Sequence, residues 1–138
     1  MTSTAMAVLG YVAWMLVLLL ILAGLRSYLT LSGARAANSF RPDGSDVSPF
    51  SGRLCRAHAN CYESFPIAGG LMLLALATGR AHVTDPLALW LLLARVGQST
   101  THLISASVPA VQVRFFFFLV QFAIAAWWVI ALLGTSTP

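Results

Sequence analysis

Charge is scarce in this chain. Of its 138 residues only 9% are charged, none is a lysine, and four acidic residues oppose eight arginines. A soluble domain carries roughly a quarter charged residues, so this composition excludes an ordinary water-soluble globule. Apolar residues are abundant instead, at 59% of the chain, and the mean hydropathy is +0.83. The composition predicts a membrane protein, and the length allows one domain.

Three further shortages exclude classes of site. The two cysteines, Cys55 and Cys61, would sit on different faces of a helix and predict no disulfide framework. Only three arginines occur between residues 57 and 138, too few for the clustered basic surface of a nucleic-acid-binding protein. The three histidines lack the paired spacing of metal ligands. The sequence therefore predicts no nucleic-acid partner and no metal site.

Four windows of the sequence are long and apolar enough to cross a membrane, which takes about 20 residues. They are residues 5–25, 56–78, 86–107 and 114–134. The middle two carry polar side chains, but a backbone in lipid must satisfy its own hydrogen bonds. Neither holds a helix breaker except Pro66 near the start of one. The sequence thus predicts an all-α bundle of four transmembrane helices, with Asp85 capping the third helix at Pro86.

The arginines predict the orientation of the chain. Five lie between residues 26 and 56 and Arg114 precedes the fourth span, whereas only Arg80 lies on the opposite side. Because positive charge concentrates in cytoplasmic loops, we expect the first and third loops in the cytoplasm and both chain ends outside it. The first span exceeds the apolar run of a signal peptide, so we expect it to be retained. The chain is then a multi-pass integral membrane protein, of the inner membrane in a bacterium.

Two of the spans carry polar stripes at helical spacing. The stripes are Arg56, Asn60 and Glu63 in the second span and Arg95, Gln98, Ser99 and His102 in the third. Polar groups inside a membrane are costly and face a bundle interior or a wet cavity, so we expect both stripes to face inward in the cytoplasmic half. Arg35 and Arg114 are expected at the same end. The stripes predict a cationic pocket with one carboxylate, suited to a small acidic ligand that also carries an ammonium group.

Simpler interpretations of these residues stand beside that pocket. An ion pair between Glu63 and Arg95 is an equally good account of both, and it does not exclude a ligand beside them. His102 alone is more often a hydrogen-bonded structural residue than a catalyst. The aromatic pair Trp127–Trp128 fits lipid-facing or interfacial side chains.

The segment Arg56–Pro66 carries a more specific pattern: Arg-Ala, then an Asn after two residues, a Glu three further on, an aromatic residue and Pro. It resembles the second-helix signature of the MAPEG superfamily, the membrane-associated proteins in eicosanoid and glutathione metabolism. The four spans and Arg114 at the start of the fourth extend the resemblance over the whole chain. The third span, from Arg95, is similar to the Arg-x-x-(His or Tyr)-x-x-x-Tyr segment of eicosanoid-forming members. The chain is expected to be a single MAPEG-like domain over residues 1–138, of bacterial type.

The resemblance implies a homotrimer that binds glutathione between subunits near the cytoplasmic face. It implies that Arg114 activates the glutathione thiol, since a fixed cation favours the reactive thiolate, and that Glu63 meets the amino group. The other expected binding residues are Arg35, Arg56, Asn60, Arg95, Gln98 and His102. Because His102 stands where eicosanoid-forming members have tyrosine, neither tyrosine-dependent thiol activation nor an eicosanoid substrate carries over.

We therefore expect a glutathione-dependent transferase or peroxidase that acts on lipophilic electrophiles or hydroperoxides in the bilayer. Glutathione is the expected substrate or cofactor, without a metal. The alternative is a non-catalytic MAPEG-like membrane protein that binds a lipid or thiol ligand, distinguished by its lack of turnover. A small transporter fits less well, because the polar residues occupy one half of the membrane only.

Overall fold

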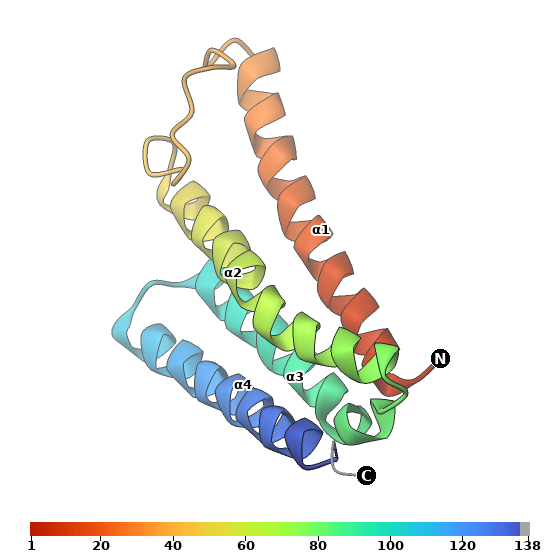
Figure 1. The fold of residues 1–138 in the computed structure, drawn as a ribbon. Helices are drawn as coiled ribbons and strands as arrows, with labels where there is room; N and C mark the ends of the chain where they lie inside the picture. Colours follow the sequence, from red (N-terminus) through yellow and green to blue (C-terminus); the bar gives the residue numbers. More distant parts are fainter. Residues whose placement is uncertain (136–138) are drawn as a thin grey trace.

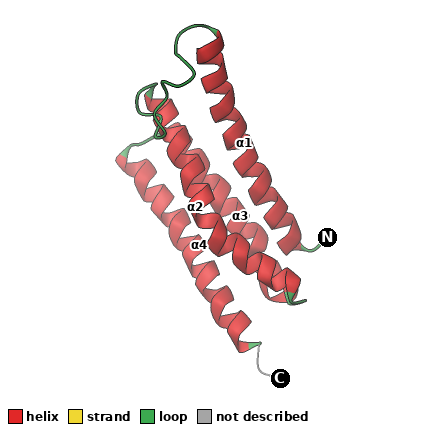
Figure 2. Cartoon of the chain, turned by 45° about the horizontal axis from the view of Figure 1, so that its top comes forward, coloured by secondary structure: helices red, strands yellow, loops and turns green. Residues whose placement is uncertain are grey.

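Four long helices make up the protein. The structure, a computed structural model, describes residues 1–135 and has no strand among them. The helices are α1 (Ser3–Leu31), α2 (Pro49–Ala77), α3 (Ala81–Ile104) and α4 (Val108–Gly134). They run alternately up and down, so that the long connection from α1 to α2 and the short one from α3 to α4 share one end, here called the loop end (Figures 1 and 2). The predicted all-α, four-helix architecture is confirmed.

All four helices begin before the predicted windows, at residues 3, 49, 81 and 108 instead of 5, 56, 86 and 114. At α2 the Ser48 hydroxyl accepts the N–H of Ser51 at 3.1 Å and Pro49 occupies the first turn, a favourable start for a helix. At α3 the chain leaves α2 through Gly79, whose φ of +68° suits glycine, and turns into the new helix at Ala81. The windows of high hydropathy therefore miss the starts of these helices, whereas the end of α2 at Ala77 agrees with the predicted window to within one residue.

The prediction that Asp85 caps α3 is wrong, because Asp85 lies inside that helix and serves α1 instead. Its Oδ1 accepts the backbone N–H of Thr4 at 2.8 Å and the Thr4 hydroxyl at 2.6 Å. The hydroxyls of Thr4 and Thr84 lie 2.7 Å apart beside it. Since the first N–H groups of a helix have no partner within the helix, Asp85 satisfies the start of α1 and ties it to α3.

The middle of the bundle is formed by α2 and α3. Helix α1 packs on both of them, α4 packs on α3 and less extensively on α2, and within residues 1–135 α1 and α4 do not touch. Tyr11 of α1 lies in the core, where its hydroxyl donates to the carbonyl of Cys61 at 3.0 Å. Trp128 is fully buried whereas Trp127 is 56% exposed, so the prediction that this pair faces lipid is wrong for Trp128.

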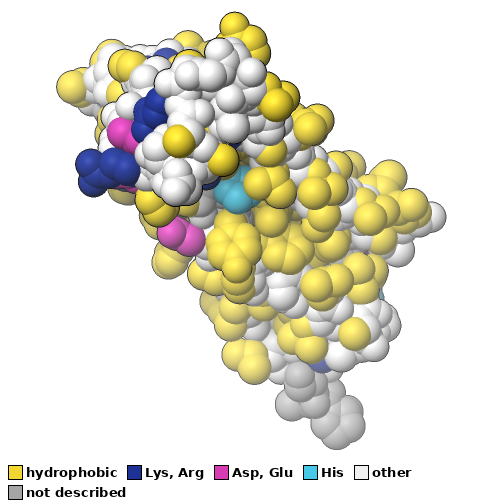
Figure 3. Space-filling view, turned by 90° about the horizontal axis from the view of Figure 1, so that it is seen from above, with side chains coloured by type: hydrophobic (Ala, Val, Ile, Leu, Met, Phe, Trp, Pro, Cys, Tyr) yellow, Lys and Arg dark blue, Asp and Glu magenta, His cyan; other side chains and the backbone are white. Residues whose placement is uncertain are grey.

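Many large apolar side chains are exposed on the outside of the bundle. By length and hydropathy, α1 and α4 are the two helices among the described residues that are apolar enough to cross a membrane. Helices α2 and α3 carry the polar stripes, and their crossing of the membrane stays a prediction. Viewed from the loop end, charged side chains gather at that end and hydrophobic side chains cover much of the remaining visible surface (Figure 3).

Candidate functional site

Four of the predicted site residues meet at the loop end of the bundle. The Asn60 side-chain nitrogen lies 3.4 Å from Nδ1 of His102, so α2 and α3 touch here through their polar stripes. His102 is 4% exposed, and the charges of Arg53, Arg56 and Arg114 are near enough to act on it electrostatically. The structure therefore places Arg56, Asn60, His102 and Arg114 in one cationic cluster.

Gln98 joins α3 to α4 next to this cluster. Its Nε2 donates to the backbone carbonyl of Arg114 at 3.2 Å, and its Oε1 accepts from Nε2 of Gln121 at 3.0 Å. Gln121 also donates to the carbonyl of Phe117. The Nε of Arg114 is buried and has no hydrogen-bond partner within the described chain. A buried donor without a partner is costly, and within the described chain the Nε of Arg95 is in the same state.

Of the α2 stripe, Asn60 is half-buried and meets α3, whereas the prediction that the stripe faces inward is wrong for its other two members. Arg56 and Glu63 are both exposed. The ion pairs in the described chain are Arg35–Asp46 and Arg41–Asp43, so the expected Glu63–Arg95 pair is not formed. The face of α2 that turns inward carries small and apolar buried side chains instead: Leu54, Ala57, Cys61 and Ala68. The i, i+4, i+7 spacing puts the polar residues on one face, but it does not say which face packs.

Arg95 lies deeper in the bundle than the cluster. It is 5% exposed, and its guanidinium lies over the Tyr11 ring at 5.9 Å from the ring centroid. Its Nε has no hydrogen-bond partner within residues 1–135. Arg95 precedes His102 by seven positions on α3, so it lies roughly 10 Å further from the loop end. Of the predicted α3 stripe, His102 belongs to the cluster and Gln98 adjoins it, whereas Arg95 and Ser99 are buried deeper in the bundle.

A cavity of about 110 Å³ opens beside Arg95 between α2, α3 and α4. Its polar lining is Ser64, Arg95 and Gln121, and apolar side chains complete it. Phe122 and Ile67 line it as well and are exposed on the outer surface. The sequence analysis gave Gln121 no role, although it is the sole polar residue between Phe115 and Leu133, and that isolation was the available signal.

Arg35 organises the first loop. Its Nη1 donates to the carbonyl of Asp46 at 2.9 Å, and its Nη2 binds the Asp46 carboxylate and the carbonyl of Ser39. This guanidinium lowers the pKa of the Asp46 carboxyl from its ordinary value, so the carboxylate stays ionised at neutral pH. The side-chain hydrogen bonds of Arg35 all go to Ser39 and Asp46 within the first loop, and none of them reaches the cluster around His102.

Four helices, polar stripes and a cationic cluster at one end agree with the family that the sequence resembles. The pattern that defines the MAPEG family matches residues 4–134, nearly the whole chain. The chain belongs to the MAPEG family. No curated protein and no solved structure matches it significantly. As a MAPEG protein it is a membrane protein of the family associated with eicosanoid and glutathione metabolism.

The chemistry available at the loop end of this MAPEG protein is that of guanidinium groups, amides and one imidazole. Such groups bind carboxylates through charge-assisted hydrogen bonds. Within residues 1–135, no three His, Cys, Asp or Glu side chains gather closely enough to hold a metal ion. The cluster is therefore suited to an anionic organic ligand, with Glu63 on the adjoining face of α2 for a cationic group.

Proposed function

We propose that this MAPEG protein is a glutathione-dependent membrane enzyme, a transferase or peroxidase for lipophilic electrophiles or hydroperoxides. One observation carries the proposal: Arg56 and Glu63 lie exposed on the α2 face that also bears Asn60, without an ion-pair partner in the described chain. Glutathione offers two carboxylates and one ammonium group to these side chains. Its thiol then needs a cation, and the buried, unpartnered Nε of Arg114 supplies a donor close by.

In this proposal Arg56 and Asn60 bind the carboxylate and peptide groups of glutathione, Glu63 pairs with its ammonium group, and Arg114 lies beside the sulfur. A fixed cation lowers the pKa of a thiol and so raises the fraction of thiolate. Gln98 and His102 hold Arg114 and Asn60 in place through their hydrogen bonds. Arg35, from the first loop, and Arg95, at the cavity, complete the proposed binding residues.

The reaction follows from the thiolate. With an electrophile, the sulfur forms a bond to the electrophilic carbon while the leaving group departs with its electron pair. With a hydroperoxide, the sulfur bonds to the terminal oxygen to give a sulfenic acid while the O–O bond breaks, and the departing alkoxide takes a proton from water to become the alcohol. A second glutathione then gives the disulfide and water.

The cavity beside Arg95 is the proposed entry for the lipophilic substrate. Its rim at Ile67 and Phe122 is exposed on the apolar surface, so a molecule dissolved in the bilayer reaches it laterally. The Gln98–Gln121 hydrogen bond connects this cavity to the backbone of Arg114. The two substrates thus approach Arg114 from opposite directions, glutathione from the loop end and the electrophile from lipid.

A homotrimer is part of the proposal, with the loop end in the cytoplasm. An exposed carboxylate in the middle of a membrane helix is costly, and Glu63 lies midway along α2. A neighbouring copy of the chain that covers this face would exclude lipid from Glu63 and enclose the ligand. We expect the mass of the protein in mild detergent, after subtraction of bound detergent, to equal three chains. A single-chain mass would contradict the shared site.

Glu63→Gln is expected to weaken glutathione binding about tenfold, because one charge-assisted hydrogen bond is lost. The dissociation constant is measured by isothermal titration calorimetry of the detergent-solubilised protein with millimolar glutathione. N-acetylglutathione, which lacks the ammonium group, should bind the wild type about as weakly as glutathione binds the variant. It should bind the variant and the wild type equally.

The matched control is Asp43→Asn, the same loss of a carboxylate in an exposed loop position, which should leave binding unchanged. A wild-type protein that does not bind millimolar glutathione would refute the proposal. Equal weakening of both ligands by Glu63→Gln would show that Glu63 acts without contacting the ammonium group.

The non-catalytic alternative keeps the same pocket, and the burial of His102 against Asn60 is the observation that favours it. An imidazole held in this way has little freedom to donate to a ligand. It would therefore not replace the tyrosine that eicosanoid-forming members have at this position. Stabilisation of the protein by glutathione, without conjugation of any generic electrophile, would favour this alternative.

A further inference from the structure

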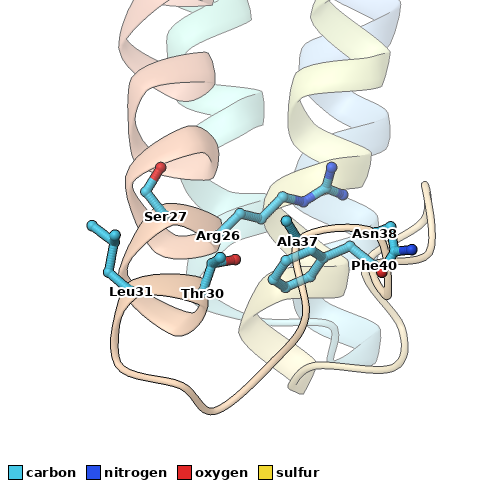
Figure 4. A pocket seen from close by; sticks show the side chains of 7 residues that line it. All are labelled: Arg26, Ser27, Thr30, Leu31, Ala37, Asn38 and Phe40. Carbon is cyan, nitrogen blue, oxygen red and sulfur yellow. The ribbon is translucent and has the colours of Figure 1, made fainter.

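A second pocket lies where α1 meets the first loop, and it shares no residue with the proposed glutathione site. Its volume is about 460 Å³. Figure 4 shows Arg26 and Thr30 reaching from the last turns of α1 toward the loop, where Phe40 faces them, with Ser27 and Leu31 on the outer side of the helix. The full lining is Arg26, Ser27, Thr30, Leu31, Ala37, Asn38 and Phe40.

The lining is cationic and rich in hydrogen-bonding groups. Arg26 stacks over the Phe40 ring at 5.5 Å. Its Nη2 donates to the carbonyl of Arg41 at 3.2 Å and to Sγ of Cys55 at 3.9 Å, so the N–H donors of its Nε and Nη1 stay available. Arg35 lies over the same ring at 5.2 Å. No acidic side chain lines the pocket, and the nearby carboxylates of the loop are already paired with Arg35 and Arg41.

Below the pocket, the same face of α1 is apolar and exposed. Leu16, Leu19, Leu20 and Ala23 line a shallow hollow there, and the helical period places them on one line with Ser27 and Thr30. From Leu16 to Ser27 the helix rises roughly 16 Å, about half of the roughly 30 Å hydrocarbon thickness of a bilayer. This face of α1 therefore offers a cationic head pocket and one leaflet's length of apolar surface.

We infer that this face of α1 binds one anionic phospholipid, with its phosphate at Arg26 and an acyl chain along Leu16, Leu20 and Ala23. Basic groups at the membrane surface attract anionic lipids. A zwitterionic lipid brings the same phosphate, but its ammonium group finds no carboxylate in the lining. A head group without a cation, such as phosphatidylglycerol, is therefore preferred. Free inorganic phosphate gains nothing from the apolar hollow, so its affinity is lower than that of the lipid.

The test is native mass spectrometry of the delipidated protein in mild detergent, titrated separately with phosphatidylglycerol, phosphatidylcholine and inorganic phosphate. We expect one phosphatidylglycerol per chain, bound about fivefold more tightly than phosphatidylcholine. Arg26→Gln should remove that preference. The matched control, Arg41→Gln, changes an exposed arginine of the same loop and should keep it. Leu20→Gln, at a position 72% exposed, should weaken both lipids and leave phosphate unchanged.

Three results would overturn the inference. The first is that Arg26→Gln and Leu20→Gln both bind lipids as the wild type does. The second is that inorganic phosphate displaces phosphatidylglycerol at comparable concentration, which would make the pocket a site for free phosphate. The third is that either variant changes the number of chains per particle while lipid binding is unchanged, which would show that a second copy covers this face. If Arg26→Gln fails to fold, as judged by its thermal melt, Leu20→Gln still tests whether the lipid binds along this face of α1.

Discussion

Replacing Arg114 by alanine is expected to lower glutathione turnover at pH 7 about 30-fold. A thiol with an ordinary pKa of about 8.5 is only roughly 3% thiolate at that pH, whereas a cation within a few ångströms makes the thiolate the main form. The measurement is the initial rate with saturating glutathione, together with the ultraviolet absorbance of the thiolate in the complex. Both should fall in Arg114→Ala.

The pH dependence separates this role from a structural one. If Arg114 acts on the thiol, the rate of Arg114→Ala should rise about tenfold per pH unit up to about pH 8.5 and approach that of the wild type there. Arg114→Lys, which keeps the charge, should recover part of the activity. Arg41→Ala, an exposed arginine of the loop, is the control and should behave as the wild type. A variant that is equally slow at every pH would contradict thiol activation by Arg114.

The second large effect concerns stability. Trp128→Ala should lower the free energy of unfolding by about 3 kcal/mol, because it removes a fully buried aromatic side chain and leaves a cavity. In a membrane protein this loss arises from packing, since lipid is as apolar as the core. The measurement is an unfolding titration in detergent, followed by circular dichroism.

Trp127→Ala is the matched control, since it makes the same change at the adjacent, 56% exposed position. It should change the free energy of unfolding by no more than about 0.5 kcal/mol. Equal losses in the two variants would mean that α4 packs through a different face from the one described.

The helices were predictable because hydropathy and helical spacing are local properties. The four apolar windows correspond to the four helices, and the family signature at Arg56–Pro66 lies within α2. The starts of α2 and α3 were not predictable from hydropathy, since Ser48 and Gly79 set them through hydrogen bonding and backbone conformation. The role of Asp85 was not predictable either, because its partner Thr4 is 81 positions away in the sequence.

The site was predictable in its members more than in its arrangement. Spacing alone placed Asn60 and His102 on stripes, and these two side chains do meet. Spacing could not show that Glu63 turns away from Arg95, because the packing face of α2 is chosen by its small apolar residues. Nor could it show the Gln98–Gln121 contact, which depends on how α3 and α4 pack.

The bond between Thr4 and Asp85 has a consequence for how the chain assembles during synthesis. The first turn of α1 finds its protein partner only after residue 85 has been made, since the two groups are 81 positions apart. Helix α1 is therefore synthesised before the N–H of Thr4 has its final acceptor, and the contact that fixes its N-terminal end forms after α2 and the start of α3 have been made. A nascent chain that stops after α2 lacks the carboxylate that holds α1 to α3 at that end.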